Sequence, residues 1–243
     1  MLGRILRIAY YFERFGNMRH KIVEVTEYLL NCEMFENEEL RARLNAEVQT
    51  NPQMKAKMPA DLYAHVLELH AHSLSWKFDW QNAVAIWDKL IGDYYPHTVT
   101  GASALMSKAV YVASKNNPEG RDVQSALDYL NDILENAPYD EILPHVLRLK
   151  AKYLAMIGRY DEARQALQQM LALIPPNPSP EFKECLEMAR WLEKAIPQME
   201  EYKRLDDEYK ARKEKQKNET MEERIERYRR ESREYNQNQQ SNQ

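Results

Sequence analysis

Glycine and cysteine are scarce in this chain of 243 residues, which contains six glycines and two cysteines. Two cysteines are too few for the disulfide framework of a small secreted protein. So few glycines disfavour phosphate-binding loops and a fold made of strands and tight turns. Apolar runs never exceed a few residues, so we expect no segment that spans a membrane. Basic and acidic residues number 34 and 38, a net charge of −4, which excludes the strongly basic balance of a general nucleic-acid-binding protein.

Sequence motifs of common catalytic and metal sites are also lacking. The chain contains no GxxxxGK[ST], GxSxG, HExxH or GxGxxG. His65, His70 and His72 do not have the i, i+4 spacing by which two histidines on one helix hold a metal ion. Cys32 and Cys185 lack CxxC spacing, so we interpret both as buried free thiols. We therefore expect no metal, no cofactor and no catalytic activity; an enzyme would require His65, Glu68 and His145 to converge in one pocket.

Three segments share one helical pattern of apolar residues. Ala83, Ala126 and Ala163 are each followed by apolar residues 4, 7, 8 and 11 positions later, which lie on one face of a helix. These residues are Trp87, Leu90, Ile91 and Tyr94, then Leu130, Ile133, Leu134 and Ala137, then Leu167, Met170, Leu171 and Ile174. A proline that ends the helix follows each segment: Pro96, Pro138 and Pro175. Asp79 and Asp122 precede the first two segments as N-caps. The pattern predicts an internal repeat.

An amphipathic segment precedes each of these three helices. The segments cover residues 61–77, 102–115 and 143–157. Each carries a small residue near its middle, which lets two antiparallel helices approach closely: Ala71, Ala109 and Ala151. The repeated unit is thus predicted to be a pair of helices joined by a turn.

This arrangement resembles the tetratricopeptide repeat family. The third pair resembles it most, through Ala151, the run Gly158-Arg159-Tyr160-Asp161-Glu162-Ala163 and the closing Pro175. The first pair matches at Ala71, Trp80, Ala83 and Trp87, and the second at Ala126 and Pro138. The alanines are 43 and 37 residues apart, against about 34 in the family, and residues 116–120 are an insertion. The resemblance covers residues 61–178 and implies an all-α solenoid of antiparallel helix pairs, wound into a right-handed superhelix.

The segments on either side of the repeats are predicted as follows. Residues 1–47 form N-terminal helices, with a possible cryptic repeat in which Lys21 stands where the family prefers alanine, and 48–60 form a linker. After the repeats, Ser179-Pro180-Glu181 starts a capping helix over 179–197 that covers the last open face. A charged helical tail over 198–235 carries 12 basic and 12 acidic residues, with a capping box at 220–223. Residues 236–243 are expected to be disordered.

The resemblance also implies a binding groove, because in this family the first helices of the pairs line the inner surface and ligand peptides lie across it. The residues at the corresponding positions are His65, Glu68, His72, Ser75, Trp76, Ser103, Met106, Val110, His145, Arg148 and Lys152. Arg148 and Lys152 lie one turn apart and would clamp a carboxylate; the alternative is that they are ordinary solvated charges. Family members that hold chaperone tails use a lysine and an asparagine where this chain has Glu68 and His72, so we expect no chaperone-related role.

These observations predict a non-enzymatic scaffold or adaptor that binds a protein partner in its groove. The alternative is a constitutive subunit of a large assembly, mitochondrial or ribonucleoprotein, that uses the charged tail as an arm. The equal charges of that tail argue against nucleic acid as a partner, although Arg227, Tyr228, Arg229 and Arg230 would suit it. The basic amphipathic segment 1–21 is either a retained helix or a mitochondrial targeting segment. We therefore expect an intracellular protein, cytoplasmic or else mitochondrial.

Overall fold

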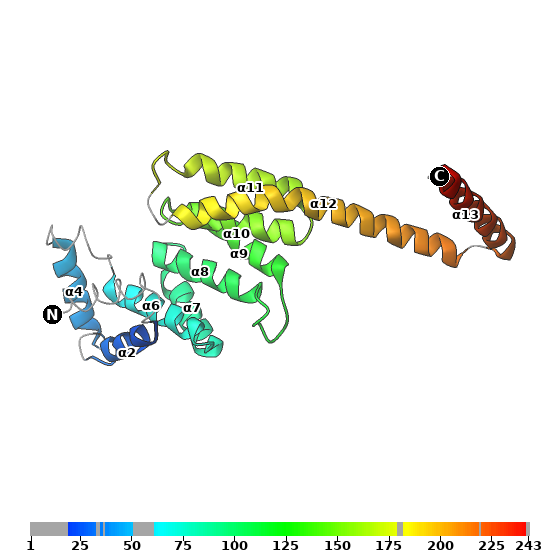
Figure 1. Ribbon diagram of the computed structural model, residues 1–243. Coiled ribbons are helices and arrows are strands. Elements are labelled where there is room, and N and C mark those ends of the chain that lie inside the picture. Colours follow the sequence, from blue (N-terminus) through cyan, green and yellow to red (C-terminus); the bar gives the residue numbers. More distant parts are fainter. Residues whose placement is uncertain are drawn as a thin grey trace. The chain divides into compact units, whose positions relative to one another are not determined.

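The computed structural model describes residues 19–32, 35, 37–50, 61–178, 182–218 and 220–241. All regular elements within these ranges are helices, so the predicted all-α class is confirmed (Figure 1). In the same ranges no helix combines the length and the apolar character that crossing a membrane requires. The chain divides into two compact units, residues 1–189 and 190–243.

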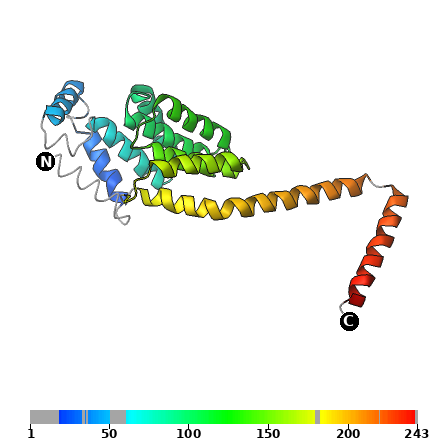
Figure 2. The ribbon, with the colours of Figure 1, turned by 90° about the horizontal axis from the view of Figure 1, so that it is seen from above.

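The first unit contains the three predicted helix pairs. They are α6 (Leu62–Trp76) with α7 (Trp80–Tyr94), α8 (Val99–Val112) with α9 (Val123–Asn136), and α10 (Leu143–Met156) with α11 (Tyr160–Leu173). The two helices of each pair pack against each other, and α7 packs on α8 as α9 packs on α10, so neighbouring pairs are also in contact (Figures 1 and 2). Each helix thus buries its apolar face against elements close to it in the chain.

Helix boundaries follow the signals read from the sequence. The carboxylates of Asp79 and Asp122 accept hydrogen bonds from the backbone N–H groups of Asn82 and Ser125, as N-caps do. The second helices end two residues before their prolines, at Tyr94, Asn136 and Leu173. Proline has no backbone N–H and a fixed φ, so the helical ladder stops before it.

Small residues mark the places where helices meet. The alanines that begin the repeat pattern are fully buried, and so are those in the first helices: Ala83, Ala126, Ala163, Ala71, Ala109 and Ala151. Around them lie large buried side chains such as Trp87, Leu130 and Met170. Gly101 in α8 lies so close to the end of α7 that a Cβ there would stand 2.5 Å from the backbone nitrogen of Tyr95. These positions need small side chains because neighbouring backbone and side chains leave no room.

Two further helices precede the pairs, α2 (Arg19–Leu30) and α4 (Glu38–Thr50). Helix α2 packs against α6, and the hydroxyl of Thr26 lies 2.9 Å from Nδ1 of His70, within hydrogen-bonding distance. A small apolar cluster also joins the two helices; it comprises Leu29, Phe35, Leu62 and Val66. Helix α4 ends three residues beyond the expected limit of the N-terminal region. The proposed first helix before residue 19, the rest of the linker and the Ser179-Pro180-Glu181 start lie outside the described residues.

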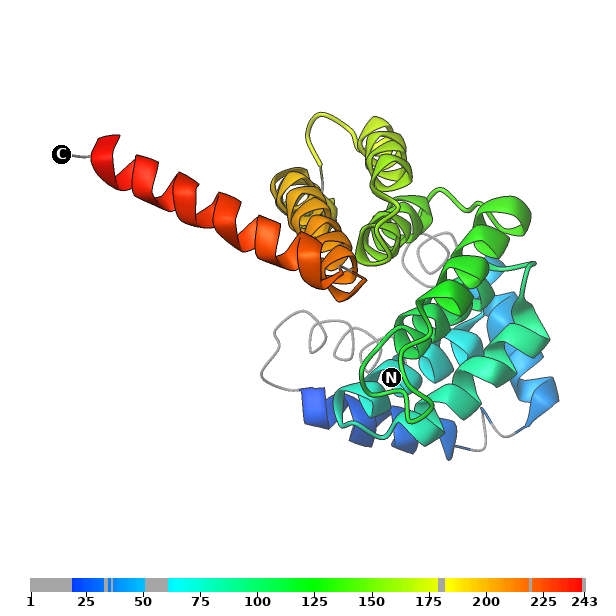
Figure 3. The same ribbon diagram turned by 90° about the vertical axis from the view of Figure 1, so that its right-hand side faces the viewer.

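The second unit contains most of α12 (Lys183–Lys217) and all of α13 (Met221–Ser241), drawn red in Figure 3. The expected division at Pro197 is not visible, because α12 continues through it. The carbonyl of Glu193, which belongs to an exposed residue, loses its hydrogen-bond donor there, because proline has no backbone N–H. Thr220 and Glu223 form the predicted capping box, with the carboxylate accepting from the backbone N–H of Thr220 at 2.8 Å. Helix α13 reaches Ser241, so residues 236–241, expected to be disordered, are helical.

Candidate partner-binding face

The eleven predicted groove residues lie on the first helices of the three pairs, and we call them the first-helix face. Five lie on α6, three on α8 and three on α10. Most are half-buried; Val110 is the most exposed, at 41%, and Ser75 is buried. Because they recur at spacings of three and four residues, each set shares one side of its helix.

On α6, Glu68 stands between two histidines. Its carboxylate oxygens lie 3.8 Å from Nδ1 of His65 and 4.0 Å from Nε2 of His72. The buried hydroxyl of Ser75 donates to the backbone carbonyl of His72 at 2.7 Å, so it is directed into its own helix. The α6 part of the face therefore presents one carboxylate between two imidazoles, an arrangement that can accept or donate hydrogen bonds.

An aromatic cluster continues from His72. Its ring stacks on Trp76 with centroids 6.5 Å apart and meets Trp87 of α7 edge-on at 6.2 Å. The indole N–H of Trp87 is buried, and no acceptor for it lies among the described residues. The sequence pattern places Trp87 on the apolar face of the second helix, and nothing in the periodicity predicts its contact with His72. The cluster supplies a large apolar surface with fixed ring orientations.

The α8 part of the face is less polar. Ser103 and Met106 are half-buried there, beside the exposed Val110. On the same helix the Nζ of Lys108 forms an ion pair with Asp88 of α7 at 2.6 Å, and Lys108 also lies over the ring of Tyr129 in α9. These two contacts link α8 to α7 and to α9. Small and apolar side chains therefore make up the α8 part of the face.

On α10, the face lies beside the beginning of α12. The ring of His145 stacks on Phe182 at 6.3 Å, and its Nδ1 lies 3.7 Å from the sulfur of Cys185. Three residues further along α10, Nη1 of Arg148 lies 3.6 Å from Oε2 of Glu184. Residues 182–185 thus cover the N-terminal half of this part of the face, which the sequence pattern alone does not show.

Cys185 and His145 resemble a nucleophile with its base, but their environment does not suit that chemistry. Cys185 is fully buried, and burial is the main cause that raises the pKa of its thiol above the ordinary value. A reactive cysteine needs an accessible thiolate, which burial disfavours. The thiol is free and buried, as predicted; Cys32 is also free but only half-buried. We interpret the Cys185–His145 contact as packing.

Three cations interact beside α10: Arg148 and Lys152, one turn apart on the helix, and Arg121. Burial lowers the pKa of Lys152, and the positive charges of Arg148 and of Arg121 lower it further. Within the described part of the chain, Nε of Arg148 is buried without a hydrogen-bond partner. Arg121 is exposed and directly follows the insertion 116–120 in the loop between α8 and α9. The sequence pattern does not indicate Arg121, because only the path of that loop brings it near α10. The arrangement favours an anion, which would relieve the repulsion among the three charges.

Comparison of the chain with protein-family models, with curated proteins and with solved structures gives no match. The function must therefore be argued from the geometry. The structure groups Glu68 with His65 and His72, whereas His145 lies with Phe182 and Cys185. Among the residues that it describes, no group of three or more His, Cys, Asp or Glu side chains is placed to hold a metal ion.

Proposed function

We propose that this protein is a non-enzymatic scaffold that binds an acidic segment of a protein partner along the first-helix face. The observation that carries the proposal is the cluster of Arg121, Arg148 and Lys152. Burial and then the two neighbouring positive charges lower the pKa of Lys152, and the buried Nε of Arg148 has no hydrogen-bond partner among the described residues. Glu184 already meets one of the three cations, Arg148, at 3.6 Å, and an acidic partner residue would meet the others. In this proposal the three pairs form a short right-handed superhelix of the tetratricopeptide kind, with the face on its inner side.

The aromatic cluster at the other end of the face supports an extended ligand. His72 and Trp76 offer a stacked, half-buried apolar surface, and Glu68 beside them offers a hydrogen-bond acceptor. Interfaces take most of their affinity from a few aromatic and arginine anchors. A partner segment would then place an apolar side chain against α6 and a carboxylate against α10.

Affinity capture from a native extract tests this proposal with two matched variants. Arg121→Glu/Lys152→Glu reverses two charges of the cluster. Lys115→Glu/Lys150→Glu makes the same change in net charge, at positions in the same loop and on the same helix. We expect the first variant to lose a specific protein that the wild type and the second variant retain, while all three have the same circular dichroism spectrum. Mass spectrometry identifies that protein, and a titration with its purified form measures the loss of affinity directly.

A set of captured proteins that is unchanged in both variants would refute the role of the cluster. A third arm, a chain truncated after Pro197, separates the two functions considered. If only the truncation loses its partners, the residues after Pro197 are the binding arm. The chain is then better described as a constitutive subunit of a larger assembly, in the cytoplasm or in mitochondria.

A further inference from the structure

The junction between α12 and α13 contains a cleft of about 680 Å³ in the second unit. Three lysines of α12 and two arginines of α13 line it: Lys210, Lys213, Lys217, Arg224 and Arg227. Among the described residues of the lining, Glu214 is the one that is acidic, and Asn218 and Tyr228 complete the set. We call this the elbow cleft. The lysines follow one another at spacings of three and four residues, so they share one side of α12.

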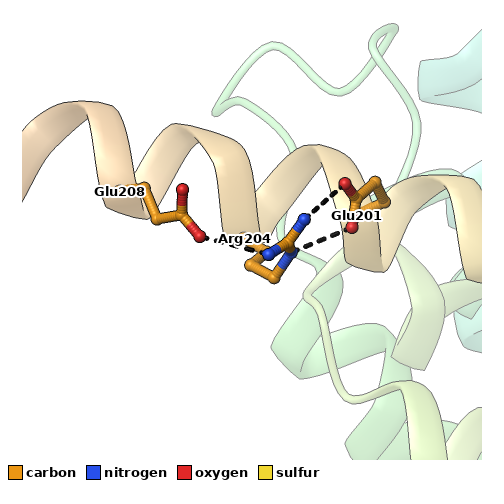
Figure 4. A network of polar contacts seen from close by, with 3 residues as sticks. All are labelled: Glu201, Arg204 and Glu208. Atoms are coloured by element: carbon orange, nitrogen blue, oxygen red, sulfur yellow. Dashed lines mark hydrogen bonds and ion pairs between the residues drawn. The ribbon is translucent and has the colours of Figure 1, made fainter.

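The charge of the elbow cleft differs from that of the helix before it. Arg204 lies between Glu201 and Glu208, at 2.6 Å and 3.2 Å, and its charge is neutralised within the helix (Figure 4). These i, i+3 and i, i+4 pairs neutralise Arg204 within its own helix. In the cleft, Lys210 has a partner of this kind, Asp206 at 2.6 Å. The equal totals of basic and acidic residues along the tail therefore conceal a local excess of positive charge.

An aromatic ring stands within this basic lining. Tyr228 is 58% exposed, and the guanidinium of Arg227 lies 4.8 Å from the centre of its ring. An exposed tyrosine beside an arginine is a platform on which a nucleic-acid base stacks, whereas a carboxylate ligand gains nothing from the ring. Sites for single strands combine a positively charged groove that follows the phosphates with aromatic rings that hold the bases.

We infer that the elbow cleft binds single-stranded RNA, with phosphates against Lys213, Lys217 and Arg224 and one base stacked on Tyr228. The inference goes beyond the proposed function, because it concerns a different unit and none of the residues of the first-helix face. It also revises the expectation, based on total charge, that nucleic acid is not a partner.

Fluorescence anisotropy with the full chain and a labelled twelve-nucleotide oligouridine tests the electrostatic part. Lys213→Glu/Arg224→Glu reverses two charges in the cleft, and Arg212→Glu/Arg229→Glu reverses two exposed charges on the same two helices outside its lining. We expect the cleft variant to bind at least tenfold more weakly and to show a shallower dependence on salt, since it makes fewer phosphate contacts. The control variant is expected to stay within about threefold of the wild type. An equal loss in both would show attraction to overall charge and would overturn the assignment of the site.

Tyrosine variants test the stacking. Tyr228→Ala is expected to weaken binding by about tenfold, because it removes the platform for one base. Tyr228→Phe keeps the ring and should bind like the wild type, and so should Tyr202→Ala, which removes another exposed tyrosine of the same unit. If Tyr228→Ala binds as tightly as Tyr228→Phe, no base stacks there and the inference is wrong.

Competition distinguishes RNA from other polyanions. A twelve-residue polyglutamate carries a similar charge without bases, and we expect it to displace the labelled RNA only at concentrations at least tenfold higher than unlabelled RNA requires. A polyglutamate that competes as well as RNA would identify the elbow cleft as a site for an acidic peptide and would overturn the proposal. The first-helix face is unchanged in all these variants, so failure here leaves the scaffold proposal intact.

Discussion

Gly101 is the residue whose replacement the structure constrains most directly. It is buried in the first turn of α8, where a Cβ would stand 2.5 Å from the backbone nitrogen of Tyr95 and 2.6 Å from the carbonyl carbon of Tyr94. Backbone atoms cannot move away as the end of a flexible side chain can. The contact therefore fixes how closely the second pair approaches the first.

We predict that Gly101→Ala destabilises the protein by about 1–3 kcal/mol, because the added methyl group forces α8 away from the end of α7. Gly92→Ala is the matched control: nothing lies within 4 Å of its Cβ position, and it is in the last turn of α7. That change should stabilise the protein through helix propensity, by up to about 0.5–1 kcal/mol, the full gain in the middle of a helix. Urea unfolding followed by circular dichroism measures both; equal stabilities of the two variants would contradict the close approach.

His70 makes the attachment of α2 sensitive to pH. Burial lowers the pKa of His70 below its ordinary value of 6.5, although the charges of Glu27 and Asp79 oppose this and that of Lys77 reinforces it. The folded state thus holds a proton at this site less readily than the unfolded chain does. Below about pH 6.5 the unfolded chain takes up a proton that the folded one resists, so stability at this site falls as the pH is lowered through 6.5 towards the depressed pKa.

We predict that His70→Gln reduces the loss of thermal stability between pH 7.5 and pH 5. Glutamine retains a hydrogen-bonding group for the hydroxyl of Thr26 but does not titrate. The melting temperature at each pH is measured by circular dichroism, with His97→Gln, at an exposed histidine, as the control. A slope that is the same in both variants and in the wild type would remove His70 from the acid response.

At the scale of elements, α12 contains an exposed internal proline, Pro197. We predict that Pro197→Ala increases helicity and stabilises α12, by up to the ~3 kcal/mol that proline costs inside a helix. Ellipticity at 222 nm and the exchange rates of amide hydrogens around residues 193–201 report the gain. Gln198→Ala, at the neighbouring exposed position, should stabilise the helix by only about a few tenths of a kcal/mol. Similar gains from both variants would mean that Pro197 does not strain the helix.

Pro197 also marks the limit of what the sequence predicts about the helices. Helix type, pairing and the caps at Asp79 and Asp122 were predictable, because period, cap and stop signals act locally. Pro96, Pro138 and Pro175 follow the ends of helices, whereas Pro197 lies inside one. The sequence does not distinguish these cases, because a proline removes one hydrogen bond wherever it stands, and whether the helix continues depends on the packing of the residues that follow.

The candidate face was predictable only in part. Repeat spacing places its eleven residues on the first helices, as the structure has them. The contacts of Arg148 with Glu184 and of His145 with Phe182 come from residues more than thirty positions away in sequence. Arg121 approaches Lys152 through the path of an insertion loop. Such juxtapositions depend on tertiary packing, which local patterns do not encode.

At the scale of the whole molecule, the charged tail contributes little to the core. Described side chains between residues 198 and 233 are exposed or half-buried, whereas Cys185 and Ala189 are buried. We predict that truncation after Glu201 leaves the midpoint of the cooperative thermal transition within about 3 °C of the full chain, since none of the described side chains that it removes is buried. Truncation after Asn177, which also removes Cys185 and its neighbours, should lower it by more. Calorimetry compares the two, and a large shift on truncation after Glu201 would contradict this division.

The helix pairs of the first unit contact mainly the elements next to them in the chain, and this has a consequence for synthesis. Contacts between near neighbours close short loops, so folding is fast and does not wait for distant segments. Once α6 and α7 have left the ribosome, their shared face is complete, and α8 adds to an existing surface. We therefore expect the unit to assemble vectorially, pair after pair, in the order in which it is translated.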